Sequence, residues 1–165
     1  MLMTDLRRKT LQSRTSPTET SAATRASRTM LVGLALTIVA GALAALDPVM
    51  TDSVAGHVRD AYPEWDAGTV STERTAIIGW LVGTGALGAI GWLSSLWAVA
   101  RRKRWALWFA ATWFALGILT AGLTLSVGGE AYDVIGPTPL ALVSALPVLA
   151  GGAALVQLWR DRFAR

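Results

Sequence analysis

One segment of the sequence carries side chains at a spacing suited to metal chemistry. His57 is the only histidine among the 165 residues, Asp60 follows it by three positions, and Glu64 lies close by. Residues three apart share a face of a helix, so an imidazole and carboxylates could bind a divalent cation there. A catalytic metal site needs three ligands in a defined geometry, and this spacing matches neither an EF-hand nor a zinc signature. We therefore expect no metal site and interpret His57, Asp60 and Glu64 as part of an acidic, water-facing surface.

The most polar side chains within the apolar stretches are hydroxyls and, near the inner interface, the Gln157 amide; none of these stretches contains an ionisable side chain. Ion-coupled transporters and proton relays place an ionisable group at bilayer depth because that group carries the mechanism. Isolated hydroxyls usually bond to their own helix or to a neighbour. We therefore expect these hydroxyls to bond within the helices; the alternative is that they line a polar pore. The residues concerned are Thr37, Thr84, Ser94, Ser95, Thr112, Thr120, Thr124 and Ser144.

Cysteine is absent from the chain, which excludes disulfides, thiolate catalysis and Cys-bound metals or clusters. Together with the lack of ionisable groups in the apolar stretches, this absence predicts a protein that is not an enzyme and binds no cofactor.

Glycines are concentrated between residues 79 and 91, without a phosphate-loop signature. Gly79 and Gly83 are four residues apart, and Gly33 and Gly41 belong to a similar row in the first apolar block. Small residues at this interval let helix backbones approach closely inside a membrane. We predict that Gly33, Gly41, Gly79 and Gly83 form the contact between the first two membrane helices.

Apolar blocks define the elements that carry these side chains. The chain is 53% hydrophobic and only 16% charged, whereas a soluble domain has about a quarter of its residues charged. Four blocks approach the roughly 20 residues that a membrane helix needs. We therefore predict an all-α, integral membrane four-helix bundle over residues 29–160. The spans are expected at about 30–46, 75–100, 105–127 and 140–159.

Polar segments flank this domain. Residues 1–28 lack apolar surface and are predicted to form a disordered basic cytoplasmic tail, and residues 161–165 form a second cytoplasmic tail. The largest loop, 47–74, contains a predicted amphipathic helix that lies on the membrane surface. Asp47 would cap this helix, Pro48 would be its first residue and Pro63 would end it.

Further capping signals mark the second and fourth spans. Ser71 is expected to cap the second span, and Thr138 followed by Pro139 is expected to start the fourth.

Charge is distributed unequally between the segments outside the spans. The two tails and the 101–104 turn hold 13 of the 15 basic residues, whereas the other two loops hold eight of the eleven acidic residues. Lys and Arg near membrane helices stay cytoplasmic, so both chain ends are predicted to be cytoplasmic. In an alternative, the first block is a signal peptide that is cleaved after Ala42-Leu43-Ala44.

The residue usage points to the origin and the surroundings of the chain. It contains no asparagine and has 13 arginines to 2 lysines, which indicates a GC-rich genome and a bacterial cytoplasmic (inner) membrane. The basic inner face is expected to attract anionic lipid. A membrane-protein partner or a homo-oligomer is possible, and no nucleic acid is expected.

In its plan the chain resembles small four-helix proteins of bacterial inner membranes whose functions are undefined. The resemblance covers residues 30–160, with a long first outer loop, an Arg-rich turn at 101–104 and a short second outer loop. A remote similarity to the DoxX-like group is compatible with this plan. The resemblance implies a multi-pass membrane protein and transfers no functional residue. We expect a structural or accessory subunit; the alternatives are a carrier or binder of an apolar ligand such as a lipid or quinone, and a membrane sensor with an acidic outer loop.

Overall fold

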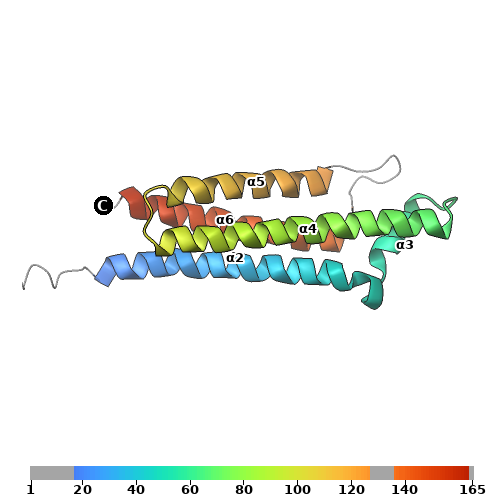
Figure 1. The fold of residues 1–165 in the computed structure, drawn as a ribbon, viewed down its shortest axis with the longest axis horizontal. Coiled ribbons are helices and arrows are strands. Elements are labelled where there is room, and N and C mark those ends of the chain that lie inside the picture. The colour runs from blue at the N-terminus through green and yellow to red at the C-terminus, as the bar shows by residue number, and fades with distance from the viewer. Residues whose placement is uncertain (1–16, 127–135, 164–165) are drawn as a thin grey trace, which may run out of the picture.

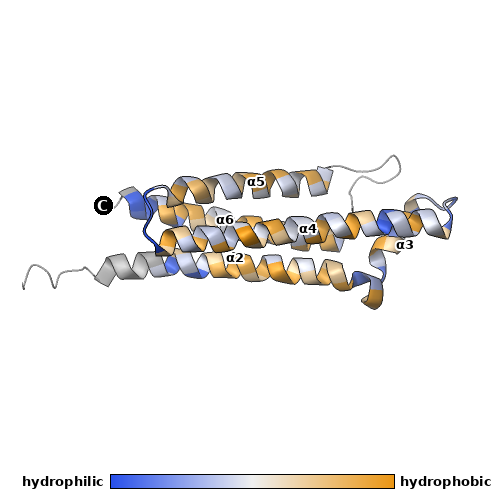
Figure 2. Ribbon diagram, viewed as in Figure 1, coloured by the Kyte–Doolittle hydropathy of each residue, from blue (hydrophilic) through white to orange (hydrophobic). Residues whose placement is uncertain are grey.

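The computed structural model describes residues 17–126 and 136–163, and every regular element in these ranges is a helix. Four of these helices are long and apolar enough to cross a membrane. Their middle parts are apolar, and hydrophilic residues gather near their ends (Figure 2). The prediction of an all-helical chain with four membrane-length helices is therefore confirmed. In chain order the helices are α2 (Pro17–Met50), α3 (Ser53–Ala61), α4 (Ala67–Ala100), α5 (Ala106–Ser126) and α6 (Thr138–Phe163).

The four long helices lie side by side and the short α3 lies at one end (Figure 1). α2 packs most extensively against α6 and α4, whereas α5 packs less extensively against the same two helices. This arrangement makes a ring in which α2 and α5 lie opposite each other. The start of α2, the α4–α5 turn and the end of α6 share one end, which we call the basic end; the other end is the α3 end.

Three of the four long helices, α2, α4 and α6, are longer than the apolar blocks predicted. α2 and α4 each contain 34 residues and would reach about 51 Å, well beyond the ~30 Å of hydrocarbon in a bilayer. Residues 17–28 belong to α2, so the prediction of a disordered tail is wrong for them; residues 1–16 lie outside the described residues. α2 also continues past Asp47, so that Pro48 lies inside its last turn and does not start a new helix.

α4 begins earlier than predicted because Asp66, and not Ser71, is its N-cap. The Asp66 carboxylate accepts hydrogen bonds from the backbone N–H of Gly68 at 2.7 Å and of Thr69 at 3.1 Å, and from the Thr69 hydroxyl at 2.6 Å. These bonds satisfy donors that have no partner within the first helical turn. α6 begins at Thr138, with Pro139 in its first turn.

A buried carboxylate joins α2 to α3. Asp47 is only 3% exposed. It accepts hydrogen bonds from the Thr51 hydroxyl at 2.6 Å, from the Ser53 hydroxyl at 2.6 Å and backbone N–H at 3.1 Å, and from the Val54 N–H at 3.0 Å. Asp47 therefore does satisfy the first turn of α3, as the sequence indicated, although that helix starts at Ser53.

The α3 helix packs onto its neighbours through its apolar side. Val54, Ala55 and Val58 are buried in one cluster, and the expected position flat on a membrane surface would require this side to be free. Asp52 precedes α3 in the left-handed conformation, with φ 48°, and pairs with Arg74 of α4 at 2.9 Å. The cluster consists of Ala44, Val54, Ala55, Val58, Val70, Ile77 and Leu81.

Candidate functional site: a cavity between the long helices

The residues considered for metal binding do not converge in the part of the chain that the structure describes. His57 and Asp60 lie on α3 and Glu64 follows it, with Asp60 and Glu64 exposed to solvent. No three His, Asp or Glu side chains among the described residues are grouped to hold a metal ion. Two of the acidic residues counted in the short second outer loop, Glu130 and Asp133, lie outside the described residues.

Threonine hydroxyls within the long helices bond to their own backbone, as expected for isolated hydroxyls in membrane helices. Each donates to the carbonyl four residues earlier, at 2.7 to 3.1 Å. Their protons are therefore committed inside the helix, while their oxygens can still accept a bond. The group comprises Thr37, Thr84, Thr112, Thr120 and Thr124.

Two tryptophans use these oxygens to connect helices. The indole N–H of Trp92 on α4 donates to Thr37 of α2 at 3.0 Å. The indole N–H of Trp80 on α4 donates to Thr124 of α5 at 3.0 Å. Because the two acceptors lie on α2 and on α5, these bonds connect α4 to both of the long helices beside it.

Three glycines lie where an aromatic ring occupies the space of a side chain. Gly33 contacts Trp92. A Cβ placed on Gly91 would be 2.7 Å from Trp113, and one on Gly151 would be 2.7 Å from Phe114. Real Cβ atoms do not approach so closely, so glycine is required for the rings to lie here.

The contact between α2 and α4 has a different register from the predicted one. Cβ atoms placed on Gly79 and Gly83 would meet no atom within 4 Å, so these residues do not form the contact. Instead, a Cβ on Gly85 would lie 3.7 Å from the Gly41 α-carbon, and one on Gly88 would lie 3.3 Å from the Thr37 methyl group. The small residues that bring α2 and α4 together are therefore Gly33 and Gly41 on α2 and Gly85 and Gly88 on α4.

A cavity of about 280 Å³ lies between all four long helices. Its size is near the lower limit of ligand pockets. None of the described residues that line it is ionisable. The cavity is partly open to the outside, and two of the residues that line it, Leu87 of α4 and Leu116 of α5, are 57% and 47% exposed.

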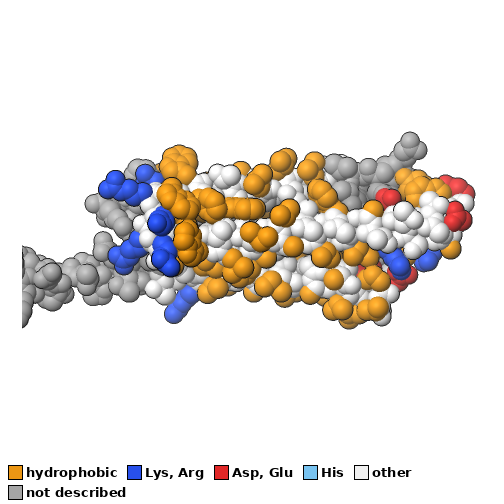
Figure 3. Space-filling view, viewed as in Figure 1, with side chains coloured by type: hydrophobic (Ala, Val, Ile, Leu, Met, Phe, Trp, Pro, Cys, Tyr) orange, Lys and Arg blue, Asp and Glu red, His pale blue; other side chains and the backbone are white. Residues whose placement is uncertain are grey.

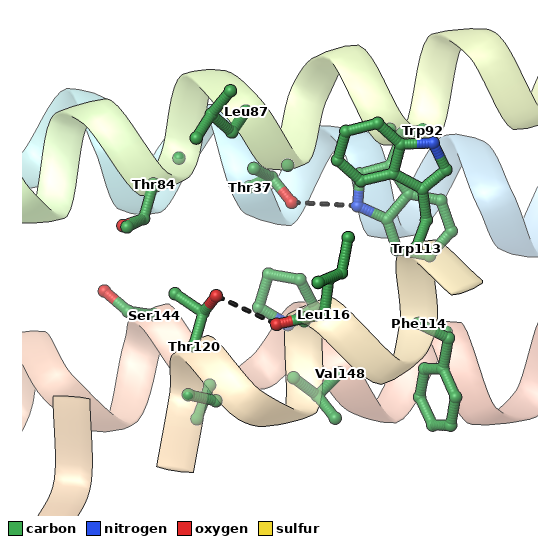
Figure 4. A pocket seen from close by; sticks show the side chains of 18 of the residues that line it. Thr37, Thr84, Leu87, Trp92, Trp113, Phe114, Leu116, Thr120, Ser144 and Val148 are labelled. Atoms are coloured by element: carbon green, nitrogen blue, oxygen red, sulfur yellow. Dashed lines mark hydrogen bonds between the residues drawn. The ribbon is translucent and has the colours of Figure 1, made fainter. Parts of the chain in front are cut away.

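The lining of the cavity changes along the helices (Figure 4). The aromatic rings of Trp92, Trp113 and Phe114 lie toward the basic end, together with Ser95. Toward the α3 end lie the hydroxyls of Thr84, Thr120, Thr124 and Ser144, each from α4, α5 or α6.

The sequence analysis treated the hydroxyls one by one and did not predict the cavity, because a cavity depends on how large and small residues of four helices combine. The Trp and Phe residues, each opposite a glycine, were the available signal. Comparison with protein families, with characterised proteins and with solved structures found no match for this chain.

Proposed function

We propose that this chain is a multi-pass membrane protein that binds a neutral, apolar molecule in the cavity between its four long helices. The observation that carries the proposal is the cavity itself, which spans α2, α4, α5 and α6 and has no ionisable side chain in its described lining. Of the functions that the sequence allowed, a binder of an apolar ligand is the one that this geometry favours over an accessory subunit.

Packing energetics support this choice. Lipid tails are as apolar as leucine, so membrane helices associate through close fit. An unfilled space between them forfeits the van der Waals contacts of its lining. An apolar occupant restores these contacts, and the partial opening of the cavity gives it a route from the lipid phase.

The same lining argues against other activities. Moving an ion or proton across the membrane requires charged or titratable groups at depth, and catalysis requires an acid, a base or a nucleophile with an activating partner. The described cavity residues include none of these. We therefore propose binding or carriage of the ligand without chemical conversion.

We further propose a bacterial cytoplasmic membrane as the location, with both chain ends in the cytoplasm. Lys and Arg side chains gather at the basic end, whereas Asp and Glu gather at the α3 end (Figure 3). This asymmetry supports the orientation through the positive-inside rule.

Tryptophans at the basic end support an interfacial position there. Trp97 is half-exposed, and the cations of Arg101 and Lys103 lie 5.9 and 6.0 Å from its ring centroid. Such a surface suits anionic lipid headgroups.

Co-purification tests the binding proposal. Gly117 lines the cavity, and a Cβ there would meet no atom within 4 Å, so Gly117→Leu should fill the space without a clash. Gly122→Leu is the matched control, because Gly122 on the same helix also has open space but does not line the cavity. Mass spectrometry of organic extracts should find one apolar compound with the wild type and the control, and at least tenfold less with Gly117→Leu. Equal recovery from all three proteins would refute the proposal.

Single cysteines test the orientation, since the chain has none of its own. Glu64→Cys and Lys103→Cys replace exposed residues at opposite ends. A membrane-impermeant thiol reagent added to intact cells should label the first and not the second. The opposite pattern would reverse the orientation.

A further inference from the structure

We infer that the molecule bound in the cavity is a neutral lipid alcohol, with its apolar chain among the aromatic rings and its hydroxyl between Thr84, Thr120 and Ser144. This inference rests on the proposed function and adds the chemistry of the ligand's polar end.

The orientation of a bound molecule would be set by the two kinds of side chain that line the cavity. Trp92, Trp113 and Phe114 lie on one side of the view in Figure 4, whereas Thr84 and Ser144 lie on the other. Thr120 of α5 lies at about the same height along the bundle as Thr84 of α4 and Ser144 of α6. A molecule with an alkyl chain and one polar group therefore matches the site best with its chain among the rings and its polar group toward Thr84, Thr120 and Ser144.

Hydrogen-bond capacity identifies the polar group. The Thr84 hydroxyl donates to the Trp80 carbonyl at 2.7 Å, and the Thr120 hydroxyl donates to the Leu116 carbonyl at 2.8 Å. Both threonines therefore offer a ligand an acceptor oxygen and no proton. Ser144 points its hydroxyl into the same space (Figure 4) and can both donate and accept.

An alcohol satisfies this arrangement in full. Its proton can go to the oxygen of Thr84 or Thr120, and its oxygen can accept the proton of Ser144. A quinone or ketone has only acceptors, so it would bring its oxygen close to two threonine oxygens whose protons point elsewhere. A carboxylate or phosphate would place a charge where no described cavity residue offers a counter-ion, and the cost of desolvating it would be high.

Thermal unfolding of the purified protein can measure this preference with dodecanol, dodecane and dodecanoate added at equal mole fraction to one detergent. A ligand that binds only the folded state raises the unfolding temperature according to its concentration and affinity. We expect dodecanol to bind about fivefold more tightly than dodecane, as one or two hydrogen bonds would give, and dodecanoate to bind more weakly than dodecanol.

Three variants locate the effect, each compared with its own unfolding temperature without probe. Ser144→Ala and the double variant Thr84→Val/Thr120→Val should each reduce the advantage of dodecanol over dodecane, because each removes one of the two hydrogen bonds of the alcohol. Thr112→Val is the control, because Thr112 makes the same bond to its own helix but does not line the cavity. It should leave the advantage unchanged.

Three further outcomes separate failure of the inference from failure of the proposed function. If dodecanol and dodecane stabilise the wild type equally and Gly117→Leu abolishes both effects, the cavity binds apolar molecules but not by their hydroxyl, and the inference is wrong. Binding of dodecanoate as tight as that of dodecanol would overturn it as well. If no probe stabilises the wild type more than Gly117→Leu, the proposed function itself is wrong.

Discussion

The α3 end and the cavity use polar groups in opposite ways. At the α3 end, one buried carboxylate gathers hydrogen bonds from Thr51, Ser53 and Val54 and joins two helices. Around the cavity, threonines such as Thr84 return their protons to their own helix. Polar contacts at the α3 end therefore join one helix to the next. Of the cavity hydroxyls, Thr37 and Thr124 accept indole N–H bonds from α4, whereas those of Thr84 and Thr120 bond only to their own helix and remain available to a ligand. Substitutions in the two regions should differ accordingly.

Asp47→Ala should have the largest effect. It would leave the hydroxyls of Thr51 and Ser53 and the N–H groups of Ser53 and Val54 without their buried acceptor. Hydrogen bonds to a charged group contribute about 1.5–3 kcal/mol. We expect a loss of about 3 kcal/mol in the free energy of unfolding, measured by chemical denaturation in detergent. Asp47→Asn keeps one acceptor oxygen and should lose less. If Asp47→Ala were as stable as the wild type, the contrast between the two regions would disappear.

Gly91→Leu should rank second. The new side chain would collide with Trp113, which lies 2.7 Å from the position of its Cβ, and overpacking costs about 2 kcal/mol. Gly83→Leu makes the same change on the same helix where no atom lies within 4 Å, and we expect a change below about 0.5 kcal/mol. Thermal unfolding of Gly83→Leu tests the register predicted from the glycine spacing, and that of Gly91→Leu tests the contact of α4 with Trp113 of α5.

Gly117→Leu should alter stability by less than about 1 kcal/mol, because the side chain enters existing space. Gly122→Leu supplies the same gain in helix propensity without filling the cavity. We therefore expect Gly117→Leu to be at least as stable as Gly122→Leu in the same unfolding assay. A loss above about 2 kcal/mol would mean that the space is not free to accept a side chain.

Asp66 should give the smallest effect, and only in acid. Hydrogen bonds from the Thr69 hydroxyl and from the N–H groups of Thr69 and Gly68 lower the pKa of Asp66 below its ordinary value. A carboxyl with a lowered pKa stabilises the fold fully above its unfolded pKa of about 3.9, and this contribution is lost as the pH falls through the folded value.

The difference in unfolding temperature between the wild type and Asp66→Ala should therefore be constant near neutral pH and shrink below about pH 4. A difference that grew on acidification would contradict this role of the charged carboxylate. Comparing the two proteins cancels the titration of the other acids.

The sequence predicted the four long helices well because length and apolar composition determine them. It predicted their ends less well. Asp47 and Pro48 read as the end of a span, yet α2 continues through them, because Asp47 finds its donors in the next segment. The residues next to Asp47 in the sequence do not reveal these hydrogen-bond donors, because several of them belong to α3.

The register in which α2 packs against α4 could not be predicted from the sequence for a related reason. α4 carries small residues on several faces, so the four-residue interval of Gly79 and Gly83 fits as well as that of the glycines that follow. The choice depends on Trp92 and Trp113, whose rings need a glycine opposite them. The cavity results from the same fit of rings to glycines, and only the assembled helices define it.

The direction of the threonine hydroxyls has a consequence for an energised membrane. Proton conduction through a protein needs a chain of groups that each accept a proton on one side and release one on the other. Thr37, Thr84, Thr120 and Thr124 all hold their protons against the carbonyl of their own helix, so they cannot pass a proton to one another without breaking those bonds. These threonine hydroxyls therefore do not form a proton-conducting chain along the cavity.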